Sequence, residues 1–133
     1  MQVETRQFAD TAVVAVFGRV DHRSAGQLEQ ALASVMAGAR PGPVVLDFAE
    51  VEYISSVGLR VLMVAAKQMR SQAAGLAIAG LQPVVAEIFT ISRFDRVLDV
   101  HASVPAALAK VSAAALAAWQ AGGAPPPASV SAP

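Results

Sequence analysis

Several features that mark whole classes of proteins are missing from this chain. It has no cysteine, which excludes disulfide bonds, a thiolate nucleophile and a cysteine-based zinc site. Ten Lys and Arg balance ten Asp and Glu, so no net charge attracts nucleic acid or anionic lipid. The first residues carry Glu4, Arg6 and Asp10 where an export signal has an apolar core. The longest apolar stretch near the middle, 61–66, is far shorter than the roughly 18 residues of a membrane span. We therefore expect a cytoplasmic protein without a membrane span that binds no nucleic acid.

The common signatures of enzymes are also missing. The chain has neither a Gly-x-Ser-x-Gly elbow nor a phosphate-binding loop. His22 and His101 have no partners at metal-ligand spacing and are interpreted as surface or loop residues. Asp47 follows an apolar run, as in a response-regulator receiver, but 17–19 lacks the acidic cluster that would hold Mg²⁺. Asp47 is therefore expected to accept local backbone hydrogen bonds. These observations predict a protein that is not an enzyme and holds no metal or cofactor.

Apolar runs alternate between strand and helix patterns, and the length fits one domain. Polar residues 1–6 show little pattern, and residues 49–55 are interpreted as a connector. A capping box at Ser24 and Gln27 marks the start of the first helix. The expected strands are Thr11–Phe17, ending at Gly18, then Val44–Phe48, Leu76–Ala79 and Val97–Val100. The expected helices are Ser24–Ala37, Ser56–Ser71, Val84–Ile91 with Pro83 at its first helical position, and Val104–Trp119. Such alternation predicts parallel crossovers and helices over a mixed sheet. Residues 120–133, rich in Ala and Pro, are expected to be a disordered tail outside a domain of residues 1–119.

Two serines stand where the connector after strand 44–48 meets the next helix. Ser55 or Ser56 is the N-cap, which accepts an orphan N–H of the first turn and contributes about 1 kcal/mol. The other serine is either a solvated residue or a hydroxyl presented to another protein. Gly58 costs up to about 1 kcal/mol relative to alanine, which indicates either crowding against the sheet or close approach by a partner. Because Ser56 and Arg60 share the polar face of the helix, Ser56 is expected to face solvent.

A longer segment around these serines resembles a known family signature. Leu46-Asp47-Phe48 followed by Tyr53-Ile54-Ser55-Ser56-Val57-Gly58-Leu59 is similar to the STAS family motif, usually Asp-Ser-Ser/Thr-Gly-Leu. Ser55 stands here in place of the aspartate and Val57 in place of the second hydroxyl. Residues 17–25 and 88–108 also resemble the family, so the likeness covers residues 3–118. It implies an α/β, STAS-like fold with a four- to five-stranded mixed sheet covered by about four helices.

The resemblance also implies a function, that of an anti-sigma factor antagonist in a partner-switching pathway. Its partner would be an anti-sigma factor with serine-kinase activity, and a serine phosphatase is a second candidate partner. Reversible phosphorylation would fall on Ser56, with Ser55 as the alternative acceptor. The residues assigned to the partner-binding surface are Asp21, His22, Ser24, Ser55, Ser56, Val57, Gly58 and Arg60.

A second interpretation stays open. The chain would then be a constitutive STAS subunit of a transport complex or of a stress-signalling scaffold, with Ser56 only a helix cap. Both a monomer and a weak homodimer fit the sequence.

Overall fold

The strands of the protein form a single mixed sheet. A computed structural model describes residues 1–37, 42–71 and 74–122. The strand order is β1-β2-β3-β4-β5, so every strand pairs with its neighbour in the sequence. β1 (Gln2–Phe8) runs antiparallel to β2 (Thr11–Val20), whereas β3 (Val44–Ile54), β4 (Leu76–Ala79) and β5 (Asp99–His101) run parallel to β2. The expected mixed α/β sheet is confirmed, with five strands in the described residues.

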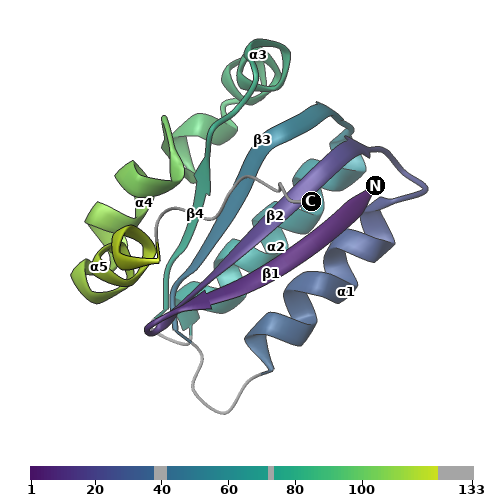
Figure 1. Cartoon of the computed structure of the whole chain (residues 1–133). Helices are drawn as coiled ribbons and strands as arrows, with labels where there is room; N and C mark the ends of the chain where they lie inside the picture. Colours follow the sequence, from purple (N-terminus) through teal and green to yellow (C-terminus); the bar gives the residue numbers. More distant parts are fainter. Residues whose placement is uncertain (38–41, 72–73, 123–133) are drawn as a thin grey trace.

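Helices lie on both sides of this sheet (Figure 1). α1 (Ala25–Met36) and α2 (Ser56–Ser71) cover one face, and α4 (Val104–Val111) and α5 (Ala113–Ala121) cover part of the other. α3 (Pro83–Ile91) and a 3-10 turn, η1 (Phe94–Arg96), connect β4 to β5. None of the helices in the described ranges is long and apolar enough to cross a bilayer.

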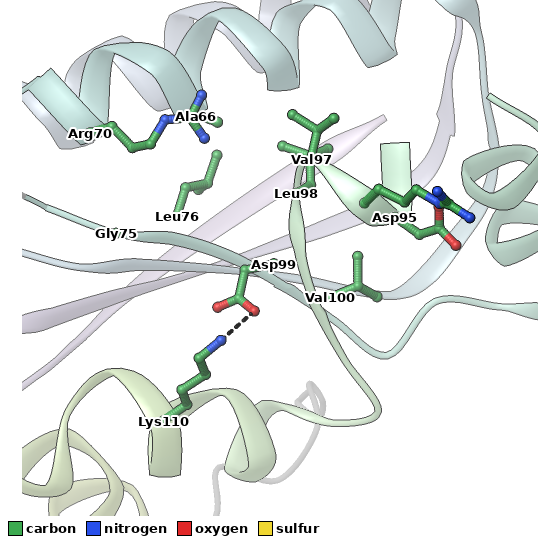
Figure 2. Close-up of a pocket in the computed structure, with 11 residues that line it drawn as sticks. Ala66, Arg70, Gly75, Leu76, Asp95, Val97, Leu98, Asp99, Val100 and Lys110 are labelled. Carbon is green, nitrogen blue, oxygen red and sulfur yellow. Dashed lines mark hydrogen bonds and ion pairs between the residues drawn. The ribbon is translucent and has the colours of Figure 1, made fainter. Parts of the chain in front are cut away.

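The last strand is shorter and later than the sequence predicts. The expected strand 97–100 begins only at Asp99, because the N–H groups of Val97 and Leu98 donate back to the Phe94 carbonyl of η1, at 3.1 and 2.8 Å. Asp99 also ties β5 to α4, since its Oδ1 accepts a hydrogen bond from Lys110 Nζ at 2.9 Å (Figure 2). Its other oxygen lies 3.1 Å from His101 Nε2.

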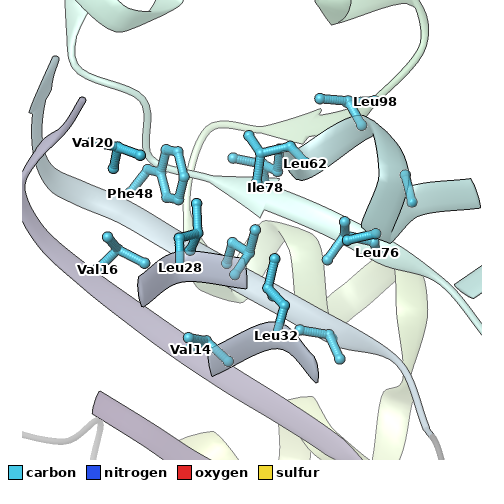
Figure 3. Packing of buried hydrophobic residues seen from close by; sticks show 14 of the residues in the cluster. Val14, Val16, Val20, Leu28, Leu32, Phe48, Leu62, Leu76, Ile78 and Leu98 are labelled. Atoms are coloured by element: carbon cyan, nitrogen blue, oxygen red, sulfur yellow. The ribbon is translucent and has the colours of Figure 1, made fainter. Parts of the chain in front are cut away.

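The side chains of the strands alternate between two apolar clusters on opposite faces of the sheet. Val14 of β2 packs with Leu28 of α1 and Leu62 of α2 in the larger cluster (Figure 3). The neighbouring Val13 belongs to the smaller cluster with Leu108 of α4. The sheet therefore stands between two layers of helices, and α2 is held by the larger core.

Residues 2–6, in which the sequence shows little pattern, form most of β1. Two expectations for the first half of the chain are wrong. Gly18 does not end β2, since it adopts a φ of +99° and the strand continues to Val20. Most of the expected connector 49–55 is strand, because β3 runs to Ile54. Two register shifts between β2 and β3 interrupt the alternation of β3, which is why its second half does not show a strand pattern.

The expected closing helix 104–119 is two helices. Ser112 separates α4 from α5 in an extended conformation, and its Oγ accepts the N–H of Ala115 at 3.1 Å. The same hydroxyl donates to Asp10 Oδ1 at 2.6 Å, which fixes the break against the turn between β1 and β2. The described residues therefore contain five α-helices rather than about four. Residues 123–133 of the expected tail lie outside the described residues.

Candidate functional site

The loop after β2 and the first turn of α2 meet at one edge of the sheet. Val20 pairs with Ile54 where β2 and β3 end. The N–H of Ser55, the next residue, donates to the Val20 carbonyl at 2.8 Å. The structure thus brings together two segments that are far apart in the sequence and that both belong to the expected partner-binding surface.

Ser55 is the residue that caps α2. Its Oγ accepts the N–H of Gly58 at 3.2 Å, and its carbonyl accepts the N–H of Leu59 at 2.9 Å. The side chain is half-buried, whereas Ser56, the first residue of α2, is exposed. Of the two serines, Ser55 therefore has a structural role, and the expectation that Ser56 faces solvent is confirmed.

Gly58 is a glycine because α2 begins very close to the sheet. A Cβ at this position would lie 2.8 Å from Cγ1 of Ile54 and 2.8 Å from Cγ1 of Val20, which is closer than carbon atoms approach. The residue is buried. Of the two interpretations of this glycine, the structure supports crowding against the sheet, and it offers no exposed side chain to a partner.

A network of hydrogen bonds fixes the shape of the loop after β2. Asp21 Oδ1 accepts the N–H groups of Arg23 and Ser24, each at 3.0 Å. Ser24 Oγ accepts the N–H of Asp21 at 2.9 Å and donates to the Arg19 carbonyl at 2.9 Å. The hydrogen bond from the Ser24 N–H is the main reason why the pKa of Asp21 lies below its usual value. Asp21 and Ser24 therefore hold the loop, and His22 stands exposed between them.

The expected capping box at the start of α1 is not formed. Ser24 precedes the helix but has helical dihedral angles, and its side chain makes no cap hydrogen bond. Its hydroxyl is occupied within the loop, and the side chain of Gln27 donates to the Met1 carbonyl at 3.3 Å. The sequence pattern was correct about where the helix begins but wrong about what the two side chains do.

The surface next to Ser56 combines an exposed apolar side chain with positive charge from Arg60 and from the N-terminus of α2. Val57 is exposed, with 45% of the residue's surface accessible, and Arg60 is exposed one turn further along α2. The first turn of α2 has no acidic residue. Because a helix carries a partial positive charge at its N-terminus, an anion on Ser56 would be stabilised there.

One contact near this surface was missed by sequence reasoning. The guanidinium of Arg19 lies 4.6 Å from the centre of the Tyr53 ring, a cation–π geometry. Arg19 and Tyr53 are register partners at the ends of β2 and β3. Tyr53 is half-buried rather than a core residue. No local signal predicts the pair, because it depends on the shifted register between the two strands.

Asp47 behaves as the sequence predicts. Its Oδ1 accepts the N–H of Ala49 at 3.1 Å, which confirms the local hydrogen bond. Burial raises the pKa of its carboxyl above the usual value. It lies within β3 and does not contribute to the surface at Ser56.

A hollow of about 550 Å³ lies elsewhere on the molecule (Figure 2). Arg70 from the last turn of α2, Leu76 of β4 and Lys110 of α4 contribute to its lining. None of the residues assigned to the partner-binding surface lines it. The expected surface at Ser56 is therefore an exposed region of the protein and not part of this hollow.

Comparison with known proteins agrees with the fold. Residues 3–105 match the family described as Mlab, STAS domain. A Bordetella bronchiseptica protein named as an anti-sigma factor antagonist, BtrV, is 44% identical over 93 residues, which are 69% of this chain and 78% of that protein. The crystal structure of an anti-sigma factor antagonist from Mycobacterium paratuberculosis is 25% identical, with a TM-score of 0.76 over 83% of this chain and 92% of that chain. The phosphorylated form of Bacillus SpoIIAA, at 15% identity, has the same fold, with a TM-score of 0.64 over 83% of this chain and 99% of that chain.

Proposed function

The chain belongs to the STAS domain family, and from this we propose that it is an anti-sigma factor antagonist controlled by phosphorylation of Ser56. The family is a class of regulatory binding domains. The unmodified protein binds an anti-sigma factor that is also a serine kinase, and this binding releases a sigma factor. The names of the relatives support the antagonist function. The observation that carries the rest is the exposed hydroxyl of Ser56 at the start of α2.

Ser56 is a better phosphate acceptor than Ser55. The Oγ of Ser55 accepts a backbone N–H and its side chain is half-buried, so modification there would break the cap of α2. That loss would cost about 1 kcal/mol. Ser56 has no such role, and a kinase can reach its hydroxyl without disturbing the helix.

Transfer of the phosphoryl group leaves the fold intact. The Ser56 oxygen attacks the γ-phosphorus of ATP held by the kinase, its proton passes to a base of the kinase, and ADP leaves. The product carries a charge of about −1.5 to −2 at the helix N-terminus. The helix dipole stabilises this charge by about 0.3–1 kcal/mol, and Arg60 is one turn away.

The same charge disrupts the interface. Unmodified Ser56 and the exposed Val57 offer a small polar group next to an apolar side chain. A dianion in that contact has to be desolvated, at a cost of several kcal/mol when no cation of the partner faces it. Since each 1.4 kcal/mol is a factor of about ten, binding weakens by orders of magnitude.

The loop after β2 forms the second part of the proposed surface. Because Asp21 and Ser24 already hold its shape, little conformational entropy is lost when a partner binds His22. Asp21 is therefore a positioning residue for this surface.

The test uses two substitutions at Ser56 and one control. Ser56→Ala is expected to bind the anti-sigma factor and to accept no phosphate, whereas Ser56→Asp is expected to bind at least tenfold more weakly. Ser34→Asp, which adds the same charge at an exposed position of α1, should bind like the wild type. Calorimetry measures binding, and intact-mass and phosphopeptide analysis after incubation with ATP and candidate kinases locates the phosphate. Wild-type affinity of Ser56→Asp, or stoichiometric phosphate on another residue, would contradict the proposal.

The constitutive-subunit function is favoured by one observation, namely Ser55 and Val57 at the positions of the aspartate and second hydroxyl of the family motif. In that case no kinase would phosphorylate Ser56, and the protein would co-purify stably with a permease or a scaffold. The mass analysis and a pull-down separate the two functions.

A further inference from the structure

Within the part of the chain that the structure describes, one of the two edges of β1 is unpaired. Residues Gln2–Phe8 pair with β2, and β1 is the first strand in the order of the sheet. Five of its seven residues are exposed, and it contains neither proline nor lysine, two common means of blocking an edge strand. The unpaired N–H and C=O groups along such an edge form a template for another strand.

The turn between β1 and β2 shows which backbone groups point outward. Phe8 and Thr11 are register partners on either side of a two-residue turn. The residues that flank such a turn form a hydrogen-bonded pair, and hydrogen-bonded and non-hydrogen-bonded pairs then alternate along the strand. The backbone groups of the even-numbered residues therefore face β2, and those of Val3, Thr5 and Gln7 face away from the sheet.

We propose that the outer edge of β1 binds the same edge of a second copy of this chain, antiparallel and about a two-fold axis at Thr5. Val3 of each copy then pairs with Gln7 of the other, and Thr5 pairs with its own equivalent. Glu4 of each copy lies opposite Arg6 of the other, as a non-hydrogen-bonded pair, in which side chains come closest. The interface is isologous and joins the two sheets into one.

The charges of Glu4 and Arg6 favour this register over the two registers that are shifted by two residues. A shift of two residues keeps the outward-facing groups opposite one another, but it places either Glu4 opposite Glu4 or Arg6 opposite Arg6 on the axis. Like charges directly opposite each other are destabilising, whereas the Thr5-centred register makes two pairs of opposite charge. Within the described residues, neither Glu4 nor Arg6 forms an ion pair inside the chain. Both are therefore available to a second copy.

This inference does not depend on the proposed function. The edge belongs to β1, the first strand of the sheet, whereas Ser56 is the first residue of α2, which follows β3. A substitution in β1 tests self-association, and a substitution at Ser56 tests the switch.

The first test reverses charged residues of β1 in the full chain. Sedimentation equilibrium over a range of concentrations measures self-association. The wild type is expected to show a reversible monomer–dimer equilibrium. Arg6→Glu places glutamates opposite each other twice and should weaken dimerisation roughly tenfold or more. The double variant Glu4→Arg/Arg6→Glu restores opposite charges and should restore the dimer. Glu87→Arg, at an exposed position of α3, is the control and should dimerise like the wild type.

Two further measurements address the backbone pairing. Thr5→Pro removes an N–H that faces outward, so it should abolish the dimer while the ladder to β2 remains. In the wild type, hydrogen exchange at the amides of Val3, Thr5 and Gln7 should slow as concentration rises, whereas exchange at Glu4 and Arg6, which face β2 in both states, should not change. A monomer at every concentration, wild-type dimerisation by Arg6→Glu, or unchanged exchange at Thr5 would overturn the proposal.

Discussion

Ser55→Ala is expected to destabilise the protein, whereas Ser56→Ala should leave its stability unchanged or slightly increase it. Ser55 supplies the hydroxyl that accepts the N–H of Gly58, and Ser56 lies exposed at the next position. The two substitutions remove the same atom from adjacent residues. Any difference between them therefore reports the role of each hydroxyl rather than the chemistry of the exchange.

The structure sets the size of the difference. Loss of a serine N-cap costs about 0.5–2 kcal/mol, typically about 1 kcal/mol. Gly58 is buried, so its N–H would lose its partner away from water, which places the cost of Ser55→Ala in the upper half of that range. At Ser56 the higher helix propensity of alanine contributes at most a few tenths of a kcal/mol, about 0.5 or less. A difference of about 1.5 kcal/mol corresponds to about 4–8 °C in Tm for a domain of this size.

Thermal and urea unfolding followed by circular dichroism would measure this difference. Ser55→Asp is the matched rescue, because a carboxylate also caps a helix and is stabilised at its N-terminus. It should retain the stability of the wild type. Equal stability of the two alanine variants, or greater destabilisation by Ser56→Ala, would show that Ser55 is not the cap and would remove the reason for choosing Ser56 as the acceptor.

Three further substitutions test individual contacts. Gly58→Ala should lower the free energy of unfolding by about 1 kcal/mol in urea titrations, because overpacking of about 1–3 kcal/mol exceeds the gain in helix propensity; a stabilised variant would contradict the crowding. Asp47→Asn should stabilise the protein at pH 7. Burial raises the pKa of Asp47, so the stabilising contribution of its protonated carboxyl is present at acidic pH and is lost as pH rises through the pKa of the folded state. The advantage of the Asn variant should therefore disappear below pH 3.8, the ordinary pKa of an aspartate. Ser112→Ala removes both the cap of α5 and the hydrogen bond to Asp10, and should allow α5 to detach before global unfolding, seen as an early change in Trp119 fluorescence.

The elements in the middle of the chain could be predicted from local pattern alone. α2 (Ser56–Ser71) and β4 (Leu76–Ala79) have the expected bounds, and α3 begins at the expected Pro83. Each has a clear apolar period and a residue at its boundary that favours a turn or a helix start. The family resemblance around Ser56 has the same origin, since it rests on a short contiguous segment, and the match over residues 3–105 confirms it.

The elements that were missed have weak local patterns for identifiable reasons. β1 is an edge strand with mostly exposed polar residues, so almost no apolar alternation marks it. The second half of β3 is out of phase because of its register shifts against β2, and its exposed Glu50 and Glu52 make it look like a connector. Strand pairing supplies the hydrogen bonds in both cases, and pairing depends on a neighbour that no short window of sequence contains.

The chain's residues alone were enough to indicate the family, the alternation of strands and helices, and a serine pair at the start of α2. The separate roles of Ser55 and Ser56 could not be read from them, because either hydroxyl can cap a helix. That choice follows from the register that places Val20 beside Ile54, which crowds Gly58 and directs its N–H to Ser55. The physical reason is that capping, crowding and edge pairing depend on contacts between distant parts of the chain, whereas sequence patterns record only the preferences of neighbouring residues.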